Sequence, residues 1–332
     1  MVKQRIQYID RLKGFAILAV VFGHICGWQL GGFLSPVWFV NAFHMPTFLF
    51  LSGLVITPPN FSKCFRKLLQ FILPALIVGG VYAYYKDSDI VRFFYHEAKM
   101  GYWYLFVLSG YYVLMMCLHY LNRYEGKKGL IVDLGFAAVI YVGLAGLHFL
   151  LGKEISGLFC VYNMFTFWPV FFLGYMVKKY QRLRAFVFSN SGYTIALIAY
   201  AIGLLLSYRD VWYYIGIPVG LVAAVFFANL FRRREEKSSI IEHELARLGR
   251  GSLDVYIFHF FFIWLISLRP FGTYCFETGN LLLYVLVAAA LSVIIAYLCL
   301  LVGYVLKSSN LLQAIIYGKG SLHTLSTKNE IV

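Results

Sequence analysis

The stretch "RLKGFAILAVVFGH", residues 11–24, begins with two basic residues, continues as an apolar run and ends on a histidine. An apolar run of this kind is typical of a transmembrane helix, which needs about 20 such residues to cross the hydrocarbon core. The charges at its start are typical of the cytoplasmic end. An ionisable group inside a membrane is unfavourable, so His24 is a candidate functional residue.

The composition of the whole chain agrees with a membrane protein. Of the 332 residues, 61% are hydrophobic and only 13% are charged, and the mean hydropathy is +0.73. A soluble domain has about 25% charged residues. The net charge of +14 does not indicate nucleic-acid binding, because the basic residues lie in short loops between apolar runs. The six cysteines are scattered, which indicates neither a metal site nor a disulfide framework.

We therefore predict an all-α polytopic membrane protein with about ten transmembrane helices and cytoplasmic N- and C-termini. It is predicted to be a single membrane domain over residues 1–332. Residues 1–13 form the cytoplasmic N-terminus, 14–306 the ten-helix core and 307–332 the cytoplasmic tail. A tight turn at residues 208–210 joins the seventh and eighth helices. The predicted helices are 14–33, 38–57, 68–85, 102–121, 130–150, 159–177, 192–207, 211–231, 253–269 and 281–306.

The distribution of basic residues supports this topology. Of the 29 Lys and Arg residues, 23 fall on the predicted inner side and 6 on the outer side. Cytoplasmic loops carry this excess in membrane proteins, so both termini are expected inside. The longest inner loop, 232–252, is predicted to contain a short amphipathic helix, and 86–101 is the longest outer loop.

The first predicted helix has a polar stripe. Lys13 and His24 are 11 residues apart, so they share a helix face and lie about 16 Å apart along the axis. Asp10 lies on the same side. The stripe leads from the inner surface to a histidine near the middle of the membrane, and we take His24, Lys13 and Asp10 as catalytic candidates. The alternatives are a histidine that hydrogen-bonds to a neighbouring helix and a lysine that only sets topology.

The stretch "FHMPTFLFLSG", residues 43–53, places a second histidine in the next predicted helix. His24 and His44 are expected in adjacent antiparallel helices at comparable depth. His44 is therefore a further catalytic candidate, which would position the acceptor or orient His24. Ser52 and Gly53 are small residues suited to close helix packing.

Three further groups could contact substrates. Lys63, Arg66 and Lys67 lie in a predicted inner loop, where cationic side chains would suit phosphates, although a loop that only sets topology explains them too. His259, in "GSLDVYIFHF" (residues 251–260), lies in the ninth predicted helix, and a structural hydrogen bond is the alternative there. Trp103 belongs to the aromatic segment "GYWYLF" at the outer end of the fourth predicted helix. We take Trp103 and His259 as substrate-binding candidates.

These stretches together resemble the acyltransferase-3 family of integral-membrane acyltransferases. The resemblance covers nearly the whole chain, and its "FHMP" form is most similar to the bacterial sugar O-acetyltransferase branch, the fucose 4-O-acetylase-like proteins. The matching pieces occur in the family's order: "IDRLKGFAILAVVFGH", "FHMPTFLFLSG", "FRKLLQFILP", "GYWYLFVL", "WPVFFLGYMVKK" and "LGRGSLDVYIFH".

The resemblance assigns roles to two groups of residues. Lys13 and His24 match a family motif of a basic residue, ten intervening residues and a catalytic histidine. Lys63 and Arg66 match a basic motif associated with the acyl-CoA donor. If that motif does not bind the donor, the alternative is the basic run 232–234.

The expected function is the transfer of an acetyl group from cytoplasmic acetyl-CoA to a hydroxyl of a cell-envelope glycan or its lipid-linked precursor. Histidine suits the removal of the hydroxyl proton near neutral pH. Acetyl-CoA is the expected co-substrate, and no metal is expected. The expected partners are acyl-CoA, the glycan or lipid-linked sugar and membrane lipid, and the expected location is the inner membrane. Homo-oligomerisation is left open. The alternative function is a transporter or flippase for a lipid-linked glycan.

Overall fold

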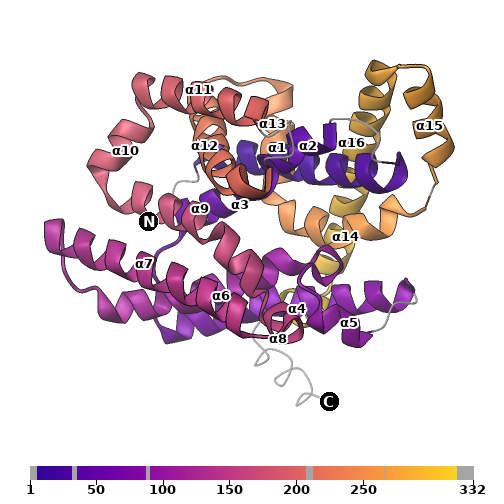
Figure 1. The fold of residues 1–332 in the computed structure, drawn as a ribbon. Helices are drawn as coiled ribbons and strands as arrows, with labels where there is room; N and C mark the ends of the chain where they lie inside the picture. The colour runs from indigo at the N-terminus through magenta and orange to yellow at the C-terminus, as the bar shows by residue number, and fades with distance from the viewer. Residues whose placement is uncertain (1–5, 32–35, 87–89, 207–211, 266, 320–332) are drawn as a thin grey trace, which may run out of the picture. The chain divides into compact units, whose positions relative to one another are not determined.

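A computed structural model describes residues 6–31, 36–86, 90–206, 212–265 and 267–319. Within these residues the chain forms helices and no strands (Figure 1). The predicted turn at 208–210 and the end of the predicted tail, 320–332, lie outside the described residues. The elements are α1 (Gln7–His24), η1 (Ile25–Gln29), α2 (Pro36–Asn41), α3 (His44–Val55), α4 (Phe61–Tyr85), α5 (Ile90–Tyr95), η2 (Lys99–Gly101), α6 (Trp103–Leu121), α7 (Gly126–Leu150), α8 (Lys153–Phe159), α9 (Val161–Lys179), α10 (Gln181–Val187), α11 (Asn190–Leu206), α12 (Trp212–Arg232), α13 (Ile240–Arg250), α14 (Ser252–Ile263), α15 (Arg269–Glu277), α16 (Leu281–Ser308) and α17 (Asn310–Tyr317).

The chain divides into two compact units, and each unit combines two separate parts of the sequence. The first unit contains residues 1–56 and 169–301, and the second contains 57–168 and 302–332. In the first unit α1 packs against α3, α12, α13 and α14. In the second unit α4 packs against α6 and α17, and α5 packs against α8. The assignment of 1–332 to one membrane domain stays a prediction.

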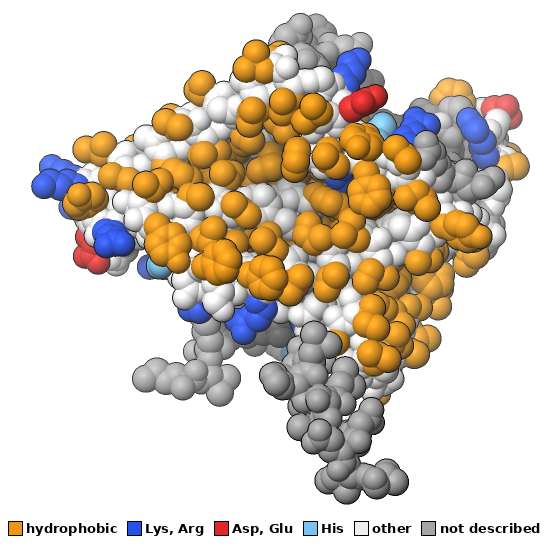
Figure 2. Space-filling view, turned by 90° about the horizontal axis from the view of Figure 1, so that it is seen from below, with side chains coloured by type: hydrophobic (Ala, Val, Ile, Leu, Met, Phe, Trp, Pro, Cys, Tyr) orange, Lys and Arg blue, Asp and Glu red, His pale blue; other side chains and the backbone are white. Residues whose placement is uncertain are grey.

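Five helices of the described chain are long and apolar enough to cross a membrane. They are Val37–Val55, which joins α2 and α3, together with α4, α6, α7 and α16. The count is seven if the bent pairs α8–α9 and α10–α11 are each one span. Hydrophobic side chains are spread across the face seen in Figure 2, as expected for a surface in contact with lipid. The protein is thus helical with several candidate spans. Each of the ten predicted segments overlaps a helix, while ten spans and cytoplasmic termini stay predictions.

Two predicted helix starts are too late. The first helix begins at Gln7 rather than 14, because Asp10 and Arg11 are buried within the protein. The helix predicted from 68 begins at Phe61, where the Asn60 side chain accepts a hydrogen bond from the backbone N–H of Lys63. An asparagine at this position is a favourable helix N-cap.

The predicted helix 253–269 and the predicted tail also differ from the structure. The ninth helix ends at Ile263, and a separate helix, α15, follows with Pro270 in its first turn. Proline is favourable there because the first turn needs no N–H donor. Within the predicted tail, α17 begins after Ser309, whose hydroxyl accepts from the N–H of Leu312.

Two glycines allow α1 and α13 to cross with their backbones in contact. A Cβ at Gly14 would lie 1.9 Å from the carbonyl oxygen of Leu245, and one at Gly249 would lie 1.7 Å from that of Asp10. No larger residue fits at either position without moving a helix. The amphipathic helix predicted within 232–252 therefore exists as α13, and it packs closely against the first half of α1.

A second crossing of this kind joins α3 and α9. A Cβ at Gly53 would lie 1.9 Å from the carbonyl oxygen of Phe171, and one at Gly174 would lie 2.1 Å from that of Phe50. The predicted packing role of Gly53 is confirmed. Small residues at such crossings let membrane helices approach closely.

We expect Gly14→Ala to lower the melting temperature of the detergent-solubilised protein. The added methyl group overlaps backbone atoms, which cannot move as a side-chain end can, and overpacking of this kind costs about 1–3 kcal/mol. Gly143→Ala on α7 is the control, because no atom lies within 4 Å of its Cβ position. Equal melting temperatures for the two variants would contradict the close α1–α13 contact.

We expect the segment 86–101 to lie on the outer side of the membrane. Cys117 is the exposed cysteine of the chain and the other five are buried, so a Cys117→Ser background removes most unwanted labelling. In that background Tyr95→Cys should react with an impermeant maleimide on intact cells. Ser62→Cys, at the start of α4, should react only after permeabilisation. The reverse order of labelling would contradict the predicted topology.

Candidate active site

His24 lies at the last residue of α1, where the helix changes geometry. Residues Ile25–Gln29 form the π-helical turn η1, closed by a hydrogen bond from the N–H of Leu30 to the carbonyl of Ile25. Such turns are rare and occur frequently at functional sites. The His24 side chain is partly exposed, and its ring makes no hydrogen bond to another described residue. The exposed part of the ring is the part that an acceptor molecule would contact.

His259 on α14 packs beside His24. The two ring centroids are 5.3 Å apart. His259 is fully buried, and its Nδ1 lies 2.9 Å from the carbonyl oxygen of Val255. A carbonyl only accepts, so this contact places the proton on Nδ1 and leaves a lone pair on Nε2. That Nε2 has no hydrogen-bond partner among the described residues.

His44 belongs to the same group of side chains. It begins α3, and its Nδ1 lies 2.7 Å from the carbonyl oxygen of Val40. The same tautomer argument leaves its Nε2 able to accept a proton. His44 lies within electrostatic range of His24. The structure thus brings His24, His44 and His259 together in the first unit.

Aromatic side chains pack beside His24 and His259. The Trp28 ring lies 4.2 Å from that of His24, and it stacks on Trp264 with a centroid distance of 6.0 Å. Phe260 contacts the rings of His24 and His259. Trp28 and Trp264 are 40% and 39% exposed, so this apolar surface is accessible to a ligand beside His24.

Asp10 and Lys13 lie on α1 but far from His24. At 1.5 Å per residue, Lys13 is about 16 Å and Asp10 about 21 Å from His24 along the helix axis. Asp10 is buried where α1 crosses α13, and Lys13 is half-buried. Neither can touch an atom that reacts at His24, so a contribution from either would come from the other end of α1.

The basic candidates Lys63, Arg66 and Lys67 lie in the second unit. They occupy the first two turns of α4, not the loop that the sequence predicted. Lys63 and Arg66 are exposed on one face, whereas Lys67 is partly buried and donates to the side-chain oxygen of Gln70. Lys67 also lies near Lys319, which follows α17. These residues stay predicted donor contacts.

Trp103 begins α6 and stacks on Phe167, with ring centroids 5.2 Å apart. The loop before it is tightly built around the buried Lys99, whose Nζ donates to the carbonyls of Phe94 and Gly157. Burial lowers the pKa of Lys99. Trp103 thus belongs to a rigid part of the second unit, and its role in acceptor binding stays a prediction.

The residues before α6 and the junction between α8 and α9 carry backbone strain and a helix cap that the sequence did not reveal. Lys99, Met100 and Cys160 have positive φ angles, which non-glycine residues seldom adopt. The Glu97 carboxylate accepts from the backbone N–H of Asn163 in the first turn of α9. Burial raises the pKa of Glu97, while the helix N-terminus favours its charged form.

Sequence reasoning missed the aromatic side chains Trp28, Phe260 and Trp264, and two buried polar residues. Gln29 follows Trp28, and Thr47 lies one turn after His44. The Gln29 amide nitrogen and the Thr47 hydroxyl have no hydrogen-bond partner among the described residues. Since buried polar atoms are nearly always paired, such exceptions are candidate ligand contacts. The spacing of His24 and Trp28, four residues apart, could have indicated a shared face.

Among the described residues, no three His, Cys, Asp or Glu side chains are placed so that they could hold a metal ion together.

Comparison with known protein families matches residues 6–301 to the acyltransferase-3 family, whose description is "Acyltransferase domain". The chain belongs to the acyltransferase-3 family. The match extends over both units and includes each histidine of the candidate site. No curated protein and no solved structure matches the chain. Family membership and the apolar helices together identify a multi-pass membrane acyltransferase.

We expect His259→Phe to reduce acyl transfer by about 10–100-fold without destabilising the protein. Phenylalanine keeps an aromatic ring and removes both the Nε2 that has no partner and the Nδ1–H bond to the carbonyl of Val255. These two losses have opposite effects on stability, so the melting temperature should change little. The measurement is transfer per folded molecule together with the melting temperature. His119→Phe, at an exposed position on α6, should leave transfer unchanged. Wild-type turnover in His259→Phe would exclude His259 from the reaction.

Proposed function

We propose that this protein transfers an acetyl group from acetyl-CoA to a hydroxyl of a cell-envelope glycan or its lipid-linked precursor in the inner membrane. The observation that carries the proposal is an accessible histidine, His24, beside a second histidine whose Nε2 can accept a hydrogen bond. Family membership supports the acyl transfer. The acetyl donor, the glycan acceptor and the relation to sugar O-acetyltransferases are parts of the proposal.

In the proposed reaction His24 acts as general base. Its imidazole takes the proton of the acceptor hydroxyl while the hydroxyl oxygen attacks the carbonyl carbon of the acetyl thioester. The tetrahedral intermediate then loses CoA thiolate as the C–S bond breaks. The proton held by His24 passes to the leaving sulfur, so the enzyme returns to its starting state. Histidine suits both steps because its ordinary pKa is close to neutral.

The second histidine would orient the first. An imidazolium formed on His24 carries two N–H donors. The Nε2 atom of His259 is an acceptor without a partner among the described residues, and its ring packs beside that of His24. Accepting a hydrogen bond from the imidazolium would favour the charged state that forms during transfer. His44 would serve the same centre by holding the acceptor or His24.

The aromatic surface supports a sugar as acceptor. Trp28 and Trp264 present large partly exposed rings next to the base. Indole rings combine an apolar face with a polar N–H, and sugars present apolar C–H faces with hydroxyls at the rim. A sugar packed against Trp28 would place its rim hydroxyls near His24. Trp103 remains a candidate contact to the same glycan.

We expect His24→Ala to abolish acetyl transfer while the protein remains folded. Loss of a general base typically reduces the rate by about 10²–10⁴-fold. The measurement is acetyl-CoA-dependent acetylation of purified envelope glycan, with the folded protein quantified in the same sample. His243→Ala, at an exposed position on α13, should keep the wild-type rate.

Measuring the activity and the stability of His24→Ala together separates a catalytic role of His24 from a structural one. If His24 has only a structural role, its replacement by alanine should lower the free energy of unfolding by about 0.5–2 kcal/mol and leave activity in proportion to the amount of folded protein. We expect His44→Ala to show a large but smaller loss than His24→Ala. Near wild-type turnover per folded molecule in His24→Ala would remove His24 from the mechanism.

A further inference from the structure

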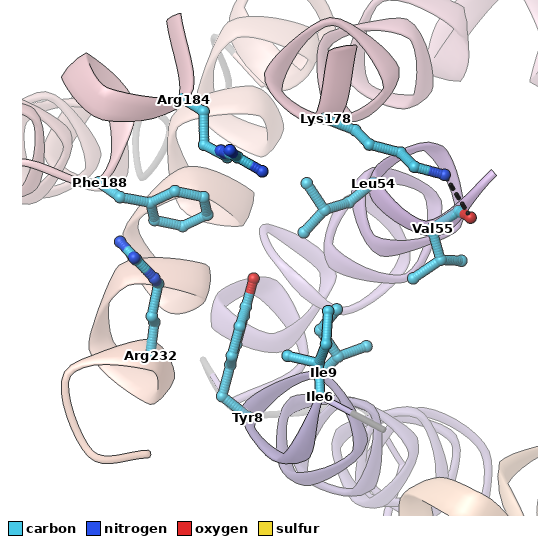
Figure 3. A pocket seen from close by; sticks show the side chains of 9 residues that line it. All are labelled: Ile6, Tyr8, Ile9, Leu54, Val55, Lys178, Arg184, Phe188 and Arg232. Atoms are coloured by element: carbon cyan, nitrogen blue, oxygen red, sulfur yellow. Dashed lines mark hydrogen bonds between the residues drawn. The ribbon is translucent and has the colours of Figure 1, made fainter. Parts of the chain in front are cut away.

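The first unit contains a cavity at the end of α1 opposite His24. The cavity, shown in Figure 3, has a volume of about 450 Å³, which is within the usual range for a small-ligand site. Its lining residues belong to, or directly flank, the helices α1, α3, α9, α10 and α12. The lining residues are Ile6, Tyr8, Ile9, Leu54, Val55, Lys178, Arg184, Phe188 and Arg232.

Three of the lining side chains are cationic and none is acidic. Arg184 makes no side-chain hydrogen bond or ion pair to another described residue. Lys178 is held in place by hydrogen bonds to the carbonyls of Val55 and Ile56 at the end of α3. The carboxylate of Glu235 lies within electrostatic range of Tyr8 but does not line the cavity. A ligand with more than one negative charge would fit this surface.

The side chains are arranged for a phosphate that carries an organic group. Arg232 packs over the Phe188 ring at 4.6 Å, which leaves the edge of its guanidinium group to donate hydrogen bonds. The Tyr8 hydroxyl points toward the middle of the group of lining side chains (Figure 3). Ile9 and Leu54 form an apolar wall. Guanidinium groups bind phosphates with paired hydrogen bonds.

We infer that this cavity binds the phosphate end of the acyl-CoA donor. The inference rests on the proposed function and adds a site to it. Tyr8 and His24 are 16 residues apart on one helix, which places them about 24 Å apart. Acyl-CoA is elongated, with its phosphates at one end and its thioester at the other. Phosphates held near Arg184 would therefore leave the thioester free to approach His24.

The basic residues of α4 are the competing donor site. Lys63 and Arg66 are exposed in the second unit and are not among the residues that line this cavity. The first-unit cavity combines cations from α9, α10 and α12 with the Tyr8 hydroxyl and with apolar side chains of α1 and α3. An anionic lipid headgroup offers the same phosphate chemistry, so the experiment distinguishes the two sources.

The test measures the binding of CoA to full-length protein in nanodiscs of phosphatidylcholine by calorimetry. Arg184→Gln with Arg232→Gln should weaken CoA binding at least about tenfold, since each lost charge-assisted contact is typically worth that much. Both positions are exposed, so the variant should fold. The control, Arg182→Gln with Lys237→Gln, removes two charges nearby that do not line the cavity and should change the dissociation constant less than about twofold.

Tyr8→Phe removes only the hydroxyl and should weaken CoA binding by a smaller factor. The double variant should also raise the KM for acetyl-CoA and keep kcat at saturating donor. Unchanged CoA affinity and KM in the double variant would overturn the inference. The inference would also be overturned if Lys63→Ala with Arg66→Ala lost CoA affinity while Arg184→Gln with Arg232→Gln did not. That result would place the phosphates at α4.

A lipid arm tests the other source of phosphate. If the double variant loses bound phosphatidylglycerol from mixed nanodiscs but binds CoA as tightly as wild type, the cavity is a lipid site and the inference is overturned. A different outcome would contradict the proposed function. A protein that binds CoA through this cavity but acetylates no glycan would refute the proposed reaction and leave the cavity assignment in place.

Discussion

The backbone contact between α1 and α13 fixes the helix on which both proposed sites depend. Gly14 and Gly249 have no Cβ atoms, so the two helices approach until carbonyl oxygens of the facing helix occupy the positions that those Cβ atoms would take. Since α1 carries Tyr8 near its start and His24 at its end, a shift of this helix would displace both the cavity and the histidine group. Contacts between backbones are stiff because they have no rotamers to adjust. The crossing therefore sets the position of His24 more precisely than apolar side-chain packing alone would.

A buried ion pair completes this contact. Arg11 is 4% exposed, donates to the carbonyls of Arg234 and Glu235, and lies 3.6 Å from the carboxylate of Glu242. Removing two charges from water is costly, and the attraction between them offsets that cost only when further hydrogen bonds are made. The carbonyls of Arg234 and Glu235, which lie between α12 and α13, supply such bonds for Arg11. The pair is thus better understood as a device that sets the register of α13 on α1 than as a large source of stability.

The sequence predicted the helical class and ten helical segments because long apolar runs admit few other structures in a membrane. It also selected His24, His44 and His259 as candidates. It could not pair His24 with His259, since the two lie on separate helices with no periodicity that relates them. It did not reveal that Arg11 is buried, because composition alone does not separate a basic residue at a membrane surface from one packed against Glu242. The late start predicted for α4 was avoidable, since Asn60 is a recognisable N-cap.

In the proposed reaction the two ends of α1 serve different parts of the donor. A charged thioester donor cannot enter hydrocarbon, but its uncharged acyl end would reach His24 while the phosphates stayed with the cations near Tyr8. His24 does not have to carry a charge before the acyl group arrives, since a neutral imidazole is the form that accepts a proton. Charge would appear on it only during transfer, when His259 can accept a hydrogen bond from it. The arrangement thus keeps fixed charge at one end of α1 and limits charge at the other end to the moment of reaction.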